Sequence, residues 1–289
     1  MKKLGLATAL VLAMTGAHAY QIEVQGQTEA LDSNADNRDF NNYSVGGQAT
    51  YYFKNVDASK GPLAEAAFIS QASNVALAYN FANLDDSKEQ NVGVKAEAYY
   101  PTSIVPAAYA SLSYSATDTD GKYGEPDDRG QRWAVELGSV VAPNFLVAVG
   151  YTNVEELTSL DTFKINASGF AKAVGEAATI AEDQDAITAR TKYVGAIDGT
   201  PMSIGFETGL VYGDATAYEL KTDLYLNSQL SAGASYAESS YAGTPDSAWG
   251  VNVNYFVTPA IAVGANYVNA NAVGGADAQT IGLNAKLRF

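Results

Sequence analysis

The chain contains 289 residues, among them 17 Lys and Arg, 32 Asp and Glu, a single His and no Cys. Its formal net charge of −15 disfavours nucleic acid as a partner, because phosphate binding relies on an excess of Lys and Arg. Without Cys there is no disulfide framework, no thiolate nucleophile and no thiolate metal site. With 19 Tyr, 26 Gly and no proline-rich or charged linker, the composition favours one domain built from many similar hairpins.

The N-terminal residues follow the pattern of a secretory signal. Lys2 and Lys3 precede an apolar stretch, and Ala17-His18-Ala19 supplies a small-residue cleavage site. We therefore predict a signal peptide over 1–19, cleavage after Ala19, and a single mature domain over 20–289. Loss of the two lysines leaves 15 basic against 32 acidic residues, so the mature net charge is −17.

The only histidine, His18, leaves with this leader. A mature chain without His or Cys cannot form a Ser-His-Asp or Cys-His site and lacks the usual zinc ligands. We therefore predict no enzyme activity, no catalytic residues, no cofactor and no defined metal site.

The strongest signal after the leader is period-two alternation of apolar and polar residues, which is typical of β-strands with two different faces. At the C-terminus, one face consists of Ile281, Leu283, Ala285, Leu287 and Phe289. No later apolar run is long enough for a membrane-spanning helix. The pattern recurs in fourteen segments: 20–31, 41–54, 72–84, 91–100, 107–117, 130–140, 145–155, 185–196, 202–213, 216–227, 229–241, 246–256, 260–270 and 278–289.

Three features favour a membrane barrel over a soluble sandwich, in which the apolar face would form the core. Most segments run about ten to thirteen residues, which suits tilted bilayer-crossing strands and exceeds the usual globular strand. The last strand ends in Phe289, which resembles the signal read by outer-membrane assembly machinery. Aromatic residues lie on the apolar face near strand ends, as interface girdles require: Tyr51, Phe53, Tyr79, Phe81, Tyr151, Tyr193, Tyr212, Tyr255 and Tyr267.

We thus predict an all-β, transmembrane, antiparallel up-and-down barrel in the outer membrane. The predicted number of strands is fourteen, within a range of twelve to sixteen. An even number places both termini on the periplasmic side. Every second connection is a tight turn, as expected for periplasmic turns: Ala142-Pro143-Asn144, Asp198-Gly199-Thr200-Pro201, Asn227-Ser228 and Thr258-Pro259. The other connections include longer acidic loops, predicted to be extracellular: 32–41, 85–90, 118–129 and 156–183.

Two connections are long enough to fold. Residues 55–71 contain GPLAEAAF and are interpreted as a folded turn packed at the barrel floor. The connection 156–183 carries an apolar, helix-compatible stretch from Phe163 to Ile180, with Ala-rich spacing around Phe170, Val174 and Ala178. We predict that it folds inward as a constriction; the alternative is a mobile extracellular loop.

The alternation also separates charges by face. None of the outward positions in the central strand segments is charged, which agrees with the cost of about 2–4 kcal/mol for Lys or Arg facing mid-membrane lipid. Inward positions include Glu23 and Lys54 and the candidate pore-lining residues, which are Lys95, Glu97, Arg132, Glu136, Arg190, Lys192, Glu207, Glu219, Lys221, Asp223, Lys286 and Arg288. These charges predict a transverse field that orients dipolar solutes; structural ion pairing that fills the barrel is the alternative. The clusters Lys95/Glu97, Arg190/Lys192 and Glu219/Lys221/Asp223 are the strongest candidates.

Several stretches resemble a family of Acinetobacter outer-membrane porins, the 33-to-36-kilodalton outer-membrane proteins. They are the leader MKKLGLATALVLAMTGAHAYQ, GPLAEAAF at 61–68, TARTKYVG at 188–195 and TIGLNAKLRF at 280–289. The resemblance implies a monomeric porin for water and small molecules, a route for carbapenems, and a role in host-cell adhesion and cytotoxicity.

The sequence thus predicts a porin that passes small solutes by diffusion. The alternative is an adhesin or host-interaction barrel with a closed or gated lumen. A barrel lipase or protease is disfavoured by the missing histidine. A fatty-acid transporter is disfavoured because the first strand begins at the cleavage site and leaves no N-terminal plug. Expected partners are outer-membrane lipid, lipopolysaccharide, the assembly machinery and small solutes.

Overall fold

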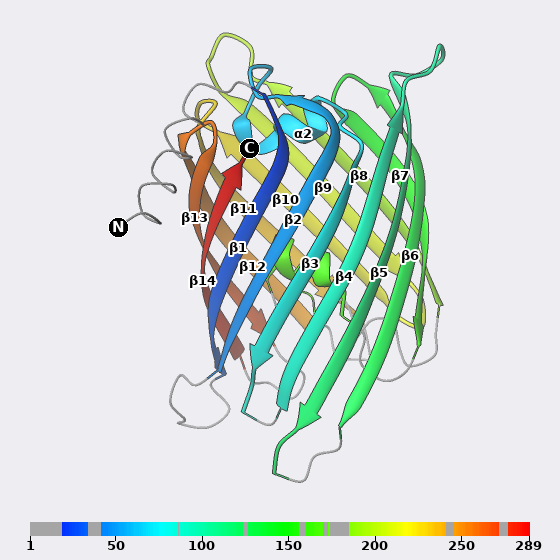
Figure 1. Cartoon of the computed structure of the whole chain (residues 1–289), viewed down its shortest axis with the longest axis vertical. Helices are drawn as coiled ribbons and strands as arrows, with labels where there is room; N and C mark the ends of the chain where they lie inside the picture. Colours follow the sequence, from blue (N-terminus) through cyan, green and yellow to red (C-terminus); the bar gives the residue numbers. More distant parts are fainter. Residues whose placement is uncertain are drawn as a thin grey trace, which may run out of the picture.

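The computed structural model describes residues 19–33, 42–85, 87–123, 127–155, 160–169, 173, 185–240, 246–271 and 277–289. Fourteen antiparallel strands close into an up-and-down barrel (Figure 1). The predicted signal peptide lies outside these residues except for Ala19, as do Phe170, Val174 and Ala178. The strands are β1 (Ala19–Ser33), β2 (Asn42–Asp57), β3 (Asn74–Asn83), β4 (Ser87–Tyr100), β5 (Ala107–Gly121), β6 (Asp128–Ala142), β7 (Phe145–Glu155), β8 (Asp185–Ala196), β9 (Ser203–Tyr212), β10 (Thr216–Tyr225), β11 (Leu230–Ser239), β12 (Asp246–Thr258), β13 (Ile261–Asn271) and β14 (Asp277–Arg288).

Each of the fourteen predicted segments corresponds to one strand, so the fold prediction is confirmed. The boundaries differ most where apolar residues are absent. β4 begins at Ser87 rather than at position 91, because its backbone pairing with β5 continues to Ser87↔Gly121 through polar residues. Periodicity detects the apolar band of a strand, whereas hydrogen bonding fixes its full length.

The barrel closes where the first and last strands pair. β1 and β14 are antiparallel from Glu23↔Arg288 to Ser33↔Ala278. The last residue extends the seam, since the Phe289 carbonyl accepts hydrogen bonds from the backbone amides of Gln21 at 2.8 Å and Ile22 at 3.1 Å. The C-terminus therefore lies at the end with the tight turns, which we call the turn end; the opposite end is the loop end (Figure 1).

The outer face is apolar, as alternation predicts. Leu77, Leu210 and Leu283 are exposed, and so are the predicted girdle residues Tyr51 and Tyr79. Neighbouring strands pair their aromatic rings, for example Trp133 with Tyr151 and Trp249 with Tyr267, with ring centroids 5.4 Å apart in both. Such a surface is stable in hydrocarbon and unfavourable in water.

The two faces of one strand give a direct test. Leu210 of β9 points outward, whereas Gly209 points inward, where an added β-carbon would approach only Glu219 Cβ, at 3.9 Å. We expect Leu210→Lys to destabilise the membrane-inserted barrel by about 2–4 kcal/mol, because the ammonium would face lipid. The matched Gly209→Lys should cost less, since its charge faces the lumen near Glu219. Urea unfolding in lipid vesicles measures both; equal losses would contradict the assignment of faces.

The described part of the interior contains short helical elements. η1 (Leu63–Glu65) and α2 (Ala66–Ile69) lie at the turn end beside the C-terminus, and α3 (Thr162–Ser168) lies further along the interior, visible as the green helix in Figure 1. In the described part of the chain, no helix has the length and apolar character needed to cross a membrane. The predictions that 55–71 packs at the barrel floor and that the start of 163–180 folds inward are confirmed for the described residues.

Candidate functional site: the barrel lumen

Residues 61–72, which we call the plug, pack inside the turn end. Leu63 joins an apolar cluster with Tyr20, Tyr52 and Phe256 from the seam side of the barrel. Phe68 joins a second cluster on β5 to β10, which includes Tyr225. The Leu63 amide also donates to the Ser228 carbonyl at 2.8 Å. The plug therefore contacts both sides of the inner wall and narrows the lumen at the turn end.

Arg288 anchors the plug to the last strand. Its Nε donates to Glu23 at 2.7 Å, and its Nη1 donates to the Leu63 carbonyl at 2.9 Å. The guanidinium lies 4.5 Å from the ring centroids of both Tyr20 and Phe256. Planar Arg suits this position because it combines cation–π stacking with directed hydrogen bonds. Only 2% of Arg288 is exposed, so this predicted pore-lining residue is part of the packed floor.

α3 is held against the inner wall of β2 to β5. The Asp161 carboxylate caps its N-terminus by accepting from the amides of Phe163 at 2.9 Å and Lys164 at 3.3 Å. The Thr162 amide donates to Ser115 Oγ at 3.2 Å. The helix lies so close to β4 that Gly93 has no room for a side chain: an added β-carbon would lie 3.0 Å from the Phe163 ring.

One ion pair reaches from α3 across the lumen. Lys164 Nζ lies 2.9 Å from a carboxylate oxygen of Glu219 on β10. α3 packs on β2 to β4, and β10 is seven positions from β3 in the closed ring of fourteen strands. The pair therefore spans opposite sides of the barrel and makes a second constriction.

The inner wall of β4 to β10 carries a connected network of charges, which we call the charged wall. Lys95 Nζ lies 3.1 Å from Glu97, and Glu97 accepts a hydrogen bond from the Tyr109 hydroxyl at 2.8 Å. Arg190 continues the network, with nitrogens 3.0 Å from Glu136 and 2.8 Å from the Tyr109 hydroxyl oxygen. These contacts join four strands through one tyrosine.

Glu207 and Glu65 extend the charged wall to the plug. Glu207 lies 3.5 Å from Arg190 and 3.7 Å from Lys192. Lys192 Nζ also lies 2.9 Å from Glu65 of the plug and 5.1 Å above the Phe68 ring centroid. The Tyr225 hydroxyl donates to Glu65 at 2.8 Å. Positive and negative groups therefore alternate along the wall.

The structure joins some predicted clusters and divides others. Lys95 and Glu97 pair as predicted, and Arg190 and Lys192 share Glu207. The third cluster is split, because Lys221 pairs with Asp223 at 3.4 Å while Glu219 binds Lys164. Lys286 shares Glu23 with Arg288, and Arg132 is buried on β6.

The inward prediction for Lys54 is wrong. The register of β1 and β2 shifts between Tyr20 and Ile22, so that their partners jump from Val56 to Tyr51. Lys54 lies in the resulting irregular stretch and is exposed. A parity count that continues through a β-bulge assigns the wrong environment to the residues inside it.

The sequence interpretation missed Glu65, Lys164 and Tyr109. Glu65 and Lys164 lie in connections, where strand parity has no meaning. For Glu65 the available signal was a single charge in the otherwise apolar GPLAEAAF; Lys164 is one of three charges in the stretch 163–180 and had no such signal. Tyr109 has inward parity, but an uncharged residue gives no signal of its own for a network of charges.

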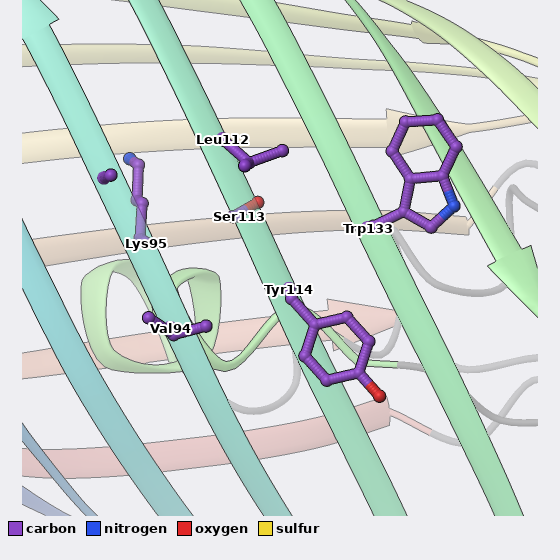
Figure 2. Close-up of a pocket in the computed structure, with 7 residues that line it drawn as sticks. Val94, Lys95, Leu112, Ser113, Tyr114 and Trp133 are labelled. Atoms are coloured by element: carbon purple, nitrogen blue, oxygen red, sulfur yellow. The ribbon is translucent and has the colours of Figure 1, made fainter.

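A shallow groove on the outer face does not belong to this site. Val94, Ala96, Leu112, Tyr114 and Trp133 line it on the lipid side, whereas Lys95 and Ser113 lie on the other side of the same strands (Figure 2). The groove is open and apolar, as expected for a surface that contacts acyl chains. Within the described ranges, no group of three or more His, Cys, Asp and Glu is placed to hold a metal ion.

Comparison with known proteins agrees with this geometry. The chain is similar to the Acinetobacter baumannii outer membrane protein Omp33, whose crystal structure is known. The two sequences are 47% identical, and the structures superpose with a TM-score of 0.70 over 94% of this chain and 99% of that chain. The CymD monoaromatic hydrocarbon channel has a TM-score of 0.55 at 9% identity, covering 93% of this chain and 89% of that chain. The latter likeness indicates a shared barrel fold alone. No curated protein matches the chain.

The family comparison covers the full length. Residues 1–289 match the model of the family described as "Putative general bacterial porin". This match, the closed barrel and the apolar outer face agree with the predicted resemblance and with location in the outer membrane. The chain therefore belongs to this family of general bacterial porins.

Proposed function

We propose that the protein is a passive diffusion channel for water and small hydrophilic solutes. The charged wall is the observation that carries this proposal: it lines the interior from β4 to β10, while the outer face of the same strands is apolar. Side chains that only filled the barrel interior would not need so many ionised groups, because burying charges costs desolvation free energy that apolar side chains do not lose. Partly exposed groups such as Lys95, Glu207 and Lys221 line a hydrated path.

The proposed path passes two constrictions in series. Solutes entering at the loop end first meet α3 and its ion pair to Glu219, and then the plug beside Arg288. Passage past these segments restricts the channel to small solutes. Between them, paired charges create a transverse field that orients dipolar molecules without strong net charge selectivity.

Single-channel recording tests the proposal through ion selectivity. Lys95 has one carboxylate partner, Glu97, and Lys221 has Asp223, so neutralising each lysine adds one unbalanced negative charge to the lumen. We expect Lys95→Gln/Lys221→Gln to conduct in stable steps and to shift the reversal potential towards cation preference.

Arg129→Gln is the matched control. Arg129 pairs with Asp118 at 3.3 Å on the exposed loop end of the barrel, outside the charged wall. Its neutralisation should leave the reversal potential unchanged at moderate salt. An unchanged potential in the lysine variant as well would show that current does not pass the charged wall.

We further propose that carbapenems use this route, on the strength of the family resemblance. Proteoliposomes that contain the barrel and an enclosed carbapenem-hydrolysing enzyme would report uptake as hydrolysis. Hydrolysis should rise with the amount of barrel, and the same vesicles without barrel give the background. Hydrolysis at the background rate would refute this extension while leaving smaller solutes open to test.

A closed barrel with a surface role is the second candidate. The contact of the plug with both sides of the wall favours it, because such packing narrows the turn end. If folded barrel in a planar bilayer gives no current and no solute uptake, an adhesin or host-interaction role becomes the better proposal. Binding of the folded protein to host cells would then be the measurement.

A further inference from the structure

The lumen has a second wall with different chemistry. Across from the charged wall, strands β11 to β14, β1 and β2 present side-chain amides. Among the inward side chains that the structure describes there, the charged ones are Glu23, Lys286 and Arg288 beside the plug and Glu29 on the loop-end side. We call this surface the amide wall. Its inward residues are Gln25, Gln48, Asn252, Asn254, Asn266 and Asn284, all half-buried.

Glycines in the neighbouring strands allow these amides to lie flat. Gly264 pairs across one ladder with Asn254 and across the next with Asn284. A β-carbon at Gly264 would lie 2.3 Å from Asn254 Oδ1 and 2.7 Å from Asn284 Oδ1. The two amides therefore occupy the space above the glycine and form one continuous polar surface.

The central amides retain free hydrogen-bonding groups. Within the part of the chain that the structure describes, neither Asn254 nor Asn284 has a hydrogen-bond partner, although each is half-buried. An amide offers two N–H donors and a carbonyl acceptor. Because these groups carry no charge, the amide wall presents donors and acceptors to a solute without attracting either ion.

We propose that the lumen selects zwitterionic amino acids whose side chains carry an amide, such as glutamine. The transverse field of the charged wall orients the ammonium and carboxylate groups of the solute as it passes. Its side-chain amide exchanges hydrogen bonds with Asn254 and Asn284 on the opposite wall. This inference rests on the proposed diffusion function and adds a solute class to it.

Three solutes with equally many side-chain heavy atoms separate the contributions. Glutamine has the neutral amide, glutamate replaces it with a carboxylate, and homoleucine replaces it with a branched alkyl group. We expect glutamine uptake into proteoliposomes at low concentration to exceed that of the other two by about 2- to 10-fold, the range expected for one net hydrogen bond. Uptake of glutamate is slower because its side chain adds a negative charge. Uptake of homoleucine is slower because its alkyl side chain leaves the amides of the wall without a hydrogen-bond partner.

Asn254→Leu/Asn284→Leu should reduce the glutamine-to-homoleucine ratio to about one, and a change in total uptake does not affect this ratio because both solutes are measured in the same variant. Asn269→Leu makes the same chemical change on the outward face of β13 and should keep the wild-type ratio. If the double leucine variant does not fold, as judged by heat-dependent gel mobility, Asn284→Ala replaces it and should lower the ratio part of the way.

The outcomes separate this inference from the proposed function. No uptake of any solute by folded barrel would refute diffusion itself. Uptake of all three solutes without a preference for glutamine would overturn the inference alone. A preference that survives both the leucine and the alanine changes would also overturn it, because the amide wall would then have no part in selection.

Discussion

Reversing one charge at the cross-lumen pair is expected to open the channel. In the structure, Lys164 Nζ lies 2.9 Å from the Glu219 carboxylate. Glu219→Lys replaces this attraction by repulsion between two positive charges. Two unit charges about 4 Å apart interact by about 4 kcal/mol at an effective dielectric of 20. A change of this size shifts a two-state equilibrium by orders of magnitude. We expect α3 to leave its position across the lumen and single-channel conductance to rise severalfold.

The double variant Lys164→Glu/Glu219→Lys restores opposite charges and should return conductance to the wild-type level. Lys60→Glu is the control, since Lys60 pairs with Asp57 at 3.6 Å at the exposed turn end and should have no effect. If Glu219→Lys keeps wild-type conductance, α3 is fixed by its contacts to β2–β5 and the ion pair does not control the opening.

Loss of Arg288 is expected to cause the largest loss of stability. Arg288→Met leaves an apolar chain between Tyr20 and Phe256 but removes the hydrogen bonds to Glu23 and to the Leu63 carbonyl. Lys286 still pairs with Glu23 Oε1 at 3.0 Å, but Glu23 Oε2 and the Leu63 carbonyl, both buried, each lose the donor that Arg288 supplies. Because each buried acceptor that loses its donor costs about 1–3 kcal/mol, we expect a loss of about 2–5 kcal/mol. Urea unfolding of the reconstituted barrel measures this loss. The plug should also detach more often, which recordings would detect as added opening events.

Lys286→Met is the matched comparison, because Lys286 pairs with the same Glu23 at 3.0 Å but is more exposed than Arg288. Glu23 keeps Arg288 in that variant, so we expect a loss of about 1 kcal/mol or less. Equal losses for both variants would mean that the rings and the Leu63 carbonyl add nothing to the role of Arg288.

Most of the fold was predictable because one physical constraint acts on every strand. Lipid excludes charge from one face and requires every backbone hydrogen bond to be paired, so alternation appears in each segment from β1 to β14. The prediction failed at Lys54 because a register shift depends on the pairing of two strands. A single segment contains no information about its partner's register.

The lumen was predictable only in part. Parity identified the inward position of Lys95, Glu97, Arg190 and Glu207, because a charge has one acceptable face in a membrane barrel. It did not predict that Lys192 meets Glu65 or that Glu219 meets Lys164. Those partners lie 127 and 55 positions apart in the chain, counted from their residue numbers, and come from connections whose path depends on the assembled barrel.

The anchor at Arg288 has a consequence for how the chain folds. Its contacts link residues separated by 265 and 225 positions, namely Glu23 and Leu63. Contacts of such high sequence separation form late and slowly, since the chain must lose its loop entropy first. β14 can complete these contacts only when the plug, which lies between β2 and β3, is already inside the barrel. Closure of the barrel and packing of the plug should therefore occur in one cooperative, rate-limiting step.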